Sequence, residues 1–171
     1  MAKYAAFLRG INVGGRIIKM AELKTCLEKA GLEQVKTLLQ SGNVTFESDK
    51  NASQLKSLIE ETLTQTFNYP AKVWVIPLEN IRKIVVANPF ADASADYHQY
   101  VVFIENDLEV KLVAEAGKQL GEEVSVGPGV VYWKVQKGQT LKSPFAKLLS
   151  KSKYREFNTN RNINTLQKIV R

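Results

Sequence analysis

The spacing of apolar residues changes along the first half of the chain in an order that fits few folds. Stretches typical of strands lie at residues 3–9, 34–39, 43–47 and 72–76, and helical spacing of three and four lies at 20–30 and 53–67. Gly31 follows the first helix, and Asn51 or Ser53 is expected to cap the second. The order strand, helix, strand, strand, helix, strand is the ferredoxin-like arrangement.

The second half of the chain repeats most of this order without obvious sequence identity. A short helix at 78–87 is followed by strands at 100–105, 122–126 and 130–136, a helix at 107–116 capped by Asn106 or Asp107, and a last helix beginning at Ser143 and Pro144. We therefore expect an α+β protein of two ferredoxin-like (βαββα) halves packed together. The N-terminal half is expected at residues 1–90, and the C-terminal half, with a basic C-terminal segment, at 91–171.

Positive charge is concentrated at the C-terminal end of the chain. The net charge is +7, and residues 134–171 contain ten lysines or arginines against a single acid, Glu156. A segment of this kind favours anionic partners, which include nucleic acid, phosphate esters and membrane surfaces. The alternative is a solvated basic face with no partner.

The content of cysteine and histidine excludes several classes of protein. One cysteine, Cys26, cannot form an internal disulfide, and one histidine, His98, makes a zinc enzyme or a catalytic triad a poor match. Cys26 lies in a predicted amphipathic helix, where it is expected to be a small buried hydrophobe rather than a reactive thiol. We expect no metal and no cofactor. No apolar run approaches the roughly 20 residues needed to span a bilayer, and the N-terminus leads directly into a strand, so a cytoplasmic protein with no membrane partner is expected.

A glycine-rich segment from Arg9 to Gly15 follows the first predicted strand. Its three glycines allow sharp bends and a close approach of the backbone to a ligand. The spacing resembles a P-loop, but Arg16 and Ile17 replace the lysine and the Ser or Thr that a nucleotide triphosphatase requires. A looser anion site remains, in which glycine amides form a nest beside Arg9 or Arg16. The alternative is a tight strand-to-helix connection with no ligand.

A second polar segment, Ser41, Gly42 and Asn43, occupies the predicted hairpin between the second and third strands. Turn chemistry explains these residue types, and a hydrogen bond to a ligand held by the first loop is the alternative. Recognition of RNA by a ferredoxin-like sheet uses aromatic residues on the third strand, where this chain has Ser41 and Asn43. Basic charge alone supports weak, nonspecific binding to nucleic acid.

A third segment, residues 158–165, contains four asparagines and an arginine before a helical stripe resumes at Leu166. Helix capping accounts for one asparagine, and a solvated loop accounts for several more. Arg161 is suited to pair with a carboxylate or phosphate, and buttressing the other half of the protein is its alternative role.

These segments resemble a bacterial family called domain of unknown function 1697. The resemblance rests on the run from Tyr4 to Gly15, on residues 20–23 and on residues 40–44, and it extends over essentially the whole chain. Thr159, Arg161, Asn162 and Thr165 resemble the family's Thr-x-Arg-Asn-x-x-Thr signature, with Ile163 where a tryptophan is common. The resemblance implies a compact α+β protein with ferredoxin-like halves, and it implies no activity, substrate or cofactor.

The leading functional hypothesis is the binding of a small anionic molecule, carrying phosphate or carboxylate, in a polar pocket. The predicted ligand-binding residues are Arg9, Gly10, Asn12, Gly14, Gly15, Ser41, Asn43, Asn160, Arg161 and Asn162. If the protein is an enzyme, this chemistry points to electrostatic stabilisation and positioning. The alternatives are a weak nucleic-acid-binding module that uses the basic C-terminal region, and a protein-interaction scaffold with no ligand.

Overall fold

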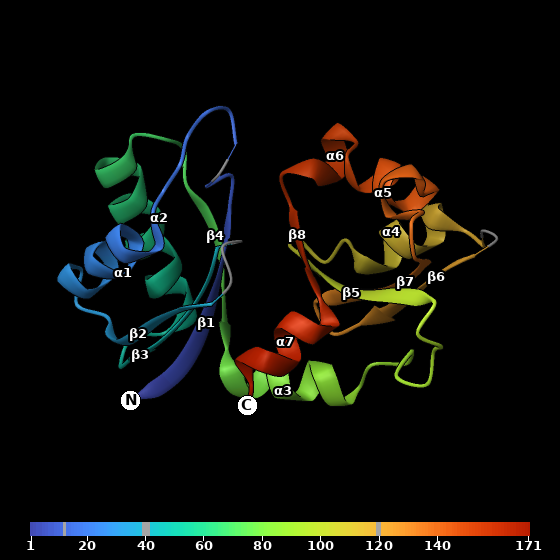
Figure 1. Cartoon of the computed structure of the whole chain (residues 1–171), viewed down its shortest axis with the longest axis horizontal. Coiled ribbons are helices and arrows are strands. Elements are labelled where there is room, and N and C mark those ends of the chain that lie inside the picture. Colours follow the sequence, from blue (N-terminus) through green and yellow to red (C-terminus); the bar gives the residue numbers. More distant parts are fainter. Residues whose placement is uncertain (12, 39–41, 119–120) are drawn as a thin grey trace. The chain divides into compact units, whose positions relative to one another are not determined.

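The chain forms two compact units, each with its own sheet (Figure 1). A computed structural model describes residues 1–11, 13–38, 42–118 and 121–171. Unit 1 comprises Met1–Arg82 and Val170, and unit 2 comprises Lys83–Ile169 and Arg171. Both units are mixed α+β structures built on a four-stranded antiparallel sheet, which confirms the predicted fold class.

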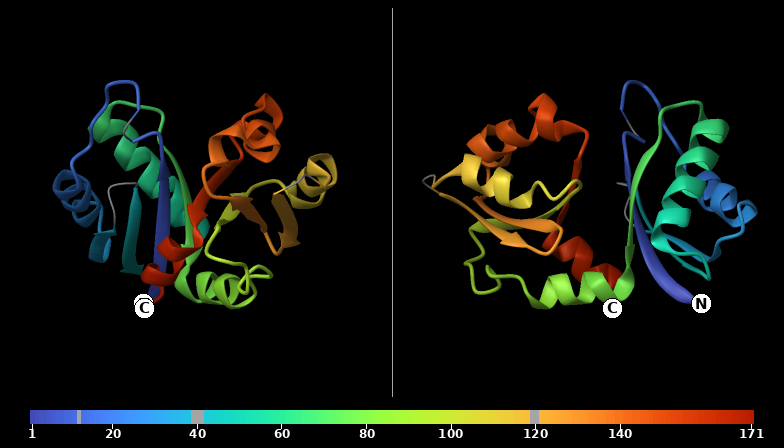
Figure 2. Two further views of the ribbon diagram at one scale, coloured as in Figure 1. Left: turned by 45° about the vertical axis from the view of Figure 1, so that its right-hand side comes forward. Right: turned by 180° about the vertical axis from the view of Figure 1, so that it is seen from behind.

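Unit 1 has the strand order β2-β3-β1-β4, which is the ferredoxin-like order. Its elements are β1 (Ala2–Arg9), α1 (Met20–Lys29), β2 (Glu33–Leu38), β3 (Asn43–Ser48), α2 (Ala52–Phe67) and β4 (Lys72–Pro77), followed by α3 (Leu78–Val86). Figure 2 shows from two sides that α1 and α2 lie against the same face of this sheet.

The N-terminus of α2 is fixed by a capping box, in which two residues cap each other. The Asn51 side chain accepts a hydrogen bond from the Gln54 backbone at 2.9 Å, and the Gln54 side chain accepts one from the Asn51 backbone at 3.0 Å. This confirms Asn51 as the cap. From this start, Leu55, Ile59 and Leu63 fall on one helical face and are completely buried against the sheet.

Alternation along β1 divides its side chains between the two faces of the sheet. Tyr4, Ala6 and Leu8 belong to the core beneath α1 and α2. Phe7 and Arg9 therefore lie on the opposite face. This division places the charged end of β1 away from the helices.

Unit 2 has the order β6-β7-β5-β8, so it repeats the topology of unit 1. Its elements are β5 (Tyr97–Ile104), α4 (Glu109–Ala116), β6 (Glu122–Gly127), β7 (Val130–Gln136), η1 (Thr140–Lys142), α5 (Pro144–Leu149), α6 (Ser152–Arg155), β8 (Asn158–Asn162) and α7 (Ile163–Ile169). Ser143 caps α5, as predicted, by accepting a hydrogen bond from the Ala146 backbone at 2.8 Å.

Two local predictions for unit 2 are wrong. The helix α4 begins after Leu108, without a side-chain cap, because Asn106 and Asp107 have φ values of 60° and 53°, in the left-handed region. The segment Asn158–Asn162 is a strand rather than a loop, so this half has the full βαββαβ order. Its polar sequence lacks the apolar alternation that would predict a strand. This strand is stabilised by the buried Asn158, whose Nδ2 donates to the carbonyls of Leu149 and Tyr154.

The same backbone contact occurs at the end of the first strand of each unit. In unit 1 the Leu8 N–H donates to the carbonyl of Gly42 at 2.8 Å, and in unit 2 the Ile104 N–H donates to the carbonyl of Gly129 at 3.3 Å. Both glycines have left-handed φ values, +77° and +70°. Each is therefore the residue that lets a hairpin turn meet the neighbouring strand.

Substituting each of these two glycines by alanine separates two losses in the free energy of unfolding. One is the cost of a left-handed backbone, and the other is the cost of steric contact between the new Cβ and neighbouring atoms. A Cβ at Gly129 meets open space, so G129A carries only the left-handed penalty of about 1–2 kcal/mol. A Cβ at Gly42 would lie 3.1 Å from the Leu8 carbonyl and 3.0 Å from Ile11 Cδ1. We expect G42A to cost about 1–3 kcal/mol more than G129A.

The two tryptophans of the chain report on these two variants separately. Trp74 lies in unit 1 and Trp133 in unit 2, so urea unfolding is followed by fluorescence in W133F and W74F backgrounds respectively. Equal losses for the two variants would show that the Gly42 turn relaxes without cost.

Candidate functional site

The connection between β1 and α1 is longer than the fold requires. It takes ten residues, 10–19, whereas the equivalent connection between β5 and α4 takes four, residues 105–108. Both connect a strand with the following helix in the same topology. The added length in unit 1 therefore has no role in closing the fold, and Figure 1 shows the loop extending beyond the end of β1.

Two buried residues hold this loop at both ends, and a tight turn forms its tip. Ile11 and Ile18 belong to the core of unit 1. Between them the Arg16 N–H donates to the Val13 carbonyl at 3.2 Å, and Gly14 and Gly15 have φ values of 62° and 78°. These φ values match a type I′ turn, which requires positive φ at both central positions.

Arg16 holds the loop against the body of unit 1. Its Nη1 donates to the Gly10 carbonyl at 3.2 Å, and its guanidinium carbon lies 4.6 Å from the centre of the Tyr69 ring. Burial raises the pKa of Tyr69, and the nearby charge of Arg16 opposes this rise. Of the two arginines predicted to face an anion, Arg16 thus has an internal role.

Positive charge gathers where β1 and β4 lie side by side. Arg9 is directly opposite Lys72 in the antiparallel register, and alternation places both on the face away from the helices. Trp74 follows Lys72 on that face, with the Lys72 ammonium 5.3 Å and the Lys56 ammonium 5.6 Å from its ring centre. Lys56 also donates to the Val73 carbonyl at 2.8 Å, which holds it at the β4 edge, and its charge is paired with Glu60 at 2.7 Å.

Trp74 contributes a buried hydrogen-bond donor to this region. Its side chain is only 5% exposed, and its Nε1 has no acceptor among the residues that the structure describes. A buried donor without an acceptor costs about 1–3 kcal/mol. Lys56, Lys72 and Trp74 were not predicted as site residues, because the register that places Lys72 opposite Arg9 is not written in either strand alone.

The hairpin residues have structural roles where they are described. Asn12 and Ser41 lie outside the described residues. Asn43 is 0% exposed, and its Nδ2 donates to the Leu38 carbonyl at 3.2 Å, joining the end of β2 to the start of β3. Gly42 provides the turn beneath Leu8.

The three predicted residues of β8 lie in unit 2 and do not share one face of its sheet. Asn160 is opposite Val102, which faces the helices, and Arg161 is opposite the preceding residue of β5, Val101. Alternation therefore places Asn160 and Asn162 on one face and Arg161 on the other. Arg161 Nη1 donates to Thr159 Oγ1 and to the Asn160 carbonyl, both at 2.8 Å.

Asn162 has a local role at the start of α7. Its Oδ1 accepts a hydrogen bond from the Asn164 N–H at 2.9 Å. Of the predicted residues, Arg9, Gly10, Gly14 and Gly15 thus follow one another along the end of β1 and the loop after it, in unit 1.

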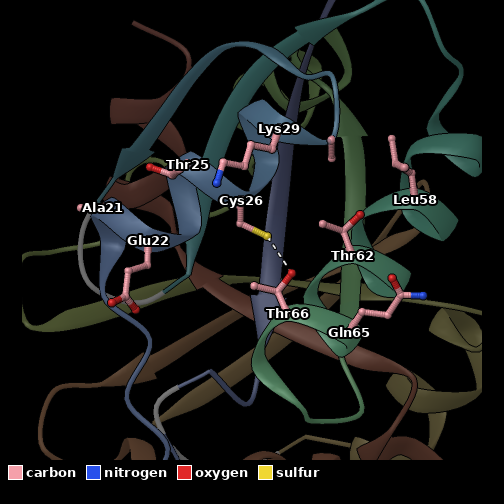
Figure 3. Close-up of a pocket in the computed structure, with 10 residues that line it drawn as sticks. Ala21, Glu22, Thr25, Cys26, Lys29, Leu58, Thr62, Gln65 and Thr66 are labelled. Atoms are coloured by element: carbon pink, nitrogen blue, oxygen red, sulfur yellow. Dashed lines mark hydrogen bonds between the residues drawn. The ribbon is translucent and has the colours of Figure 1, made fainter.

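A separate groove of about 660 Å³ runs between α1 and α2 (Figure 3). Its lining residues are Ala21, Glu22, Thr25, Cys26, Lys29, Ala30, Leu58, Thr62, Gln65 and Thr66, none of which was predicted as a site residue. The thiol of Cys26 donates to Thr66 Oγ1 at 3.3 Å. Cys26 is half-buried rather than buried as predicted, because it lies at the margin of the helix–helix contact.

The described part of the chain contains no group of three His, Cys, Asp or Glu side chains that could hold a metal ion. Within the same residues, every helix is too short or too polar to cross a membrane.

Comparisons with known proteins identify relatives but no activity. A family model described as "Protein of unknown function (DUF1697)" matches residues 1–132. The structure of the conserved bacterial protein SP0830 from Streptococcus pneumoniae is similar, with a TM-score of 0.81 and 26% sequence identity, over 99% of this chain and 97% of that chain. No curated protein matches the chain.

Replacing Arg16 by alanine tests its contact with Tyr69. Because R16A removes the positive charge that lowers the pKa of Tyr69, this pKa should rise further above its ordinary value. Loss of the cation–π contact should also lower the stability by about 0.5–1 kcal/mol.

Titration of tyrosinate absorbance measures this pKa, and the Y69F variant identifies which step belongs to Tyr69. R16K retains the charge and is the matched control, with a smaller rise expected. A Tyr69 pKa that is the same in R16A and in the wild type would contradict the contact.

Proposed function

The chain belongs to the DUF1697 family, described as proteins of unknown function, and from the geometry of the first loop we propose that it binds a small anionic molecule. The ligand carries a phosphate or carboxylate group. The binding groups are Arg9, Lys72 and the backbone amides of the glycine-rich loop.

The observation that carries this proposal is the long glycine-rich loop that begins beside a pair of cations. Arg9 and Lys72 are directly opposite each other on neighbouring strands, where like charges are mutually destabilising. An anion beside them would be attracted by both cations, and the fork of an arginine matches two oxygens of a phosphate or carboxylate.

The loop adds donors that carry no charge. Gly10, Gly14 and Gly15 all have left-handed φ values, and successive amides in such conformations form concave anion sites. A Cβ on Gly14 or Gly15 would meet nothing within 4 Å, so no protein atom crowds these two glycines. The Trp74 N–H lies on the same strand as Lys72 and is a further donor in need of an acceptor.

The proposal differs from a nucleotide triphosphatase. The helix α1 begins at Met20, well after the last glycine of the loop, so its N-terminus does not follow the loop directly as in a P-loop. Arg16, at the position of the P-loop lysine, is engaged with Gly10 and Tyr69. A compact anion is therefore favoured over a triphosphate.

Trp74 gives a direct readout of binding at this position. In a W133F background it is the single tryptophan, and Lys72 lies 5.3 Å from its ring centre. Titration with a library of phosphate and carboxylate metabolites should reveal one or a few compounds that change its fluorescence. The R9A and K72A variants should each weaken binding by about 10- to 100-fold, the loss expected for one hydrogen bond to a charged group.

The matched control is K3A, which removes a lysine from the other end of β1 that pairs with Glu47 at 3.6 Å. It should leave the affinity unchanged, and melting curves establish that each variant is folded. An affinity that is equal in wild type, R9A and K72A would place any ligand elsewhere. A library without a single binder would contradict anion binding at this loop.

A further inference from the structure

We propose that unit 2 carries an interaction surface for the sugar-phosphate backbone of double-stranded nucleic acid, formed by residues 137–155, which include η1, α5 and α6. This surface is defined by Lys137, Lys142, Lys147, Lys151, Lys153 and Arg155. It is independent of the anion site proposed for unit 1.

The charge of this surface is unlike that of the rest of the protein. From Lys137 to Arg155 there are six cations and no acid. Outside residues 134–171 the chain has fourteen cations and sixteen acids, so the excess of positive charge belongs to the C-terminal end alone. All six cations are exposed. Lys153 pairs with Glu115 at 2.7 Å, so part of the charge at that position is already compensated.

The fold separates apolar and basic side chains along this segment. Phe145, Leu148 and Leu149 of α5 and Tyr154 of α6 are buried in the core of unit 2. Lys147 and Lys151, which lie between them in sequence, are exposed. The cations are therefore held on short, packed helices rather than on a free tail.

The buried side chains indicate which anionic polymer fits. Stacking of unpaired bases requires exposed aromatic rings, and both aromatic residues between Lys137 and Arg155 are buried. Insertion into a membrane requires an outward apolar face, but Phe145, Leu148 and Leu149 of α5 are buried, and Leu141 is the single large apolar side chain exposed on this segment. Contact with phosphates alone matches the backbone of a duplex, whether DNA or RNA.

The test compares the salt dependence of duplex binding in two triple variants of the full chain. K142Q/K147Q/K151Q removes three cations from the proposed surface. K24Q/K29Q/K36Q removes three exposed lysines from unit 1 and changes the net charge equally. Fluorescence anisotropy with a labelled DNA duplex and a labelled RNA duplex, over a series of salt concentrations, gives the affinity and its slope. Anionic phospholipid vesicles form a third arm.

For the wild type we expect weak binding to both duplexes, with affinity that falls steeply as salt rises. K142Q/K147Q/K151Q should weaken binding at least about tenfold and reduce the slope of log affinity against log salt by up to about 3. The unit 1 variant should retain most of the affinity. Equal losses in the two variants would reduce the effect to net charge and overturn the proposal. Failure to bind either duplex, or binding to vesicles alone, would also overturn it.

Discussion

One backbone hydrogen bond sets the frame on which each unit depends. It joins the end of the first strand to the carbonyl of the glycine in the adjacent hairpin turn, from Leu8 to Gly42 in unit 1 and from Ile104 to Gly129 in unit 2. A left-handed residue is needed for the turn to reach the strand, and in unit 1 the turn lies so close to Leu8 that a side chain would collide with it. The loop between β1 and α1 starts one residue beyond Arg9, so its position depends on this contact.

The two units share this hydrogen bond but differ in the segment that follows the first strand. In unit 1 the strand ends in Arg9 and leads into a long glycine-rich loop, whereas in unit 2 the strand is followed by Glu105 and a short loop. Since the topology is the same, the differences are not explained by the fold. We therefore propose these differences as the places where function has been added to a shared scaffold, which is how one fold supports different activities. The two proposed sites follow this logic, with small-anion binding in unit 1 and duplex binding on the packed helices of unit 2.

The residues show why part of the site could be predicted and part could not. The glycine-rich loop is recognisable because three glycines within the six residues from Gly10 to Gly15 are excessive for a simple connection. Lys72 was missed, because a lysine at the start of a strand has no significance until the register places it opposite Arg9. Asn43 and Asn158 have the same residue type as ligand-binding positions, yet the structure buries both and uses their amides to hold backbone carbonyls. The sequence alone does not distinguish a polar loop residue that binds a ligand from a polar residue that is buried and hydrogen-bonded to the backbone.

The sequence by itself determined most of the periodic elements and the caps of α2 and α5. Apolar spacing, Asn51 before α2 and Ser143 before α5 act through neighbours a few residues away, so local patterns are sufficient to predict them. Tertiary structure decided β8 and the cation pair. A polar strand such as Asn158–Asn162 gains its conformation from pairing with β5, and the Arg9–Lys72 pair exists only once β1 and β4 are in register. Both depend on contacts between residues far apart in the chain, and no local preference encodes such contacts.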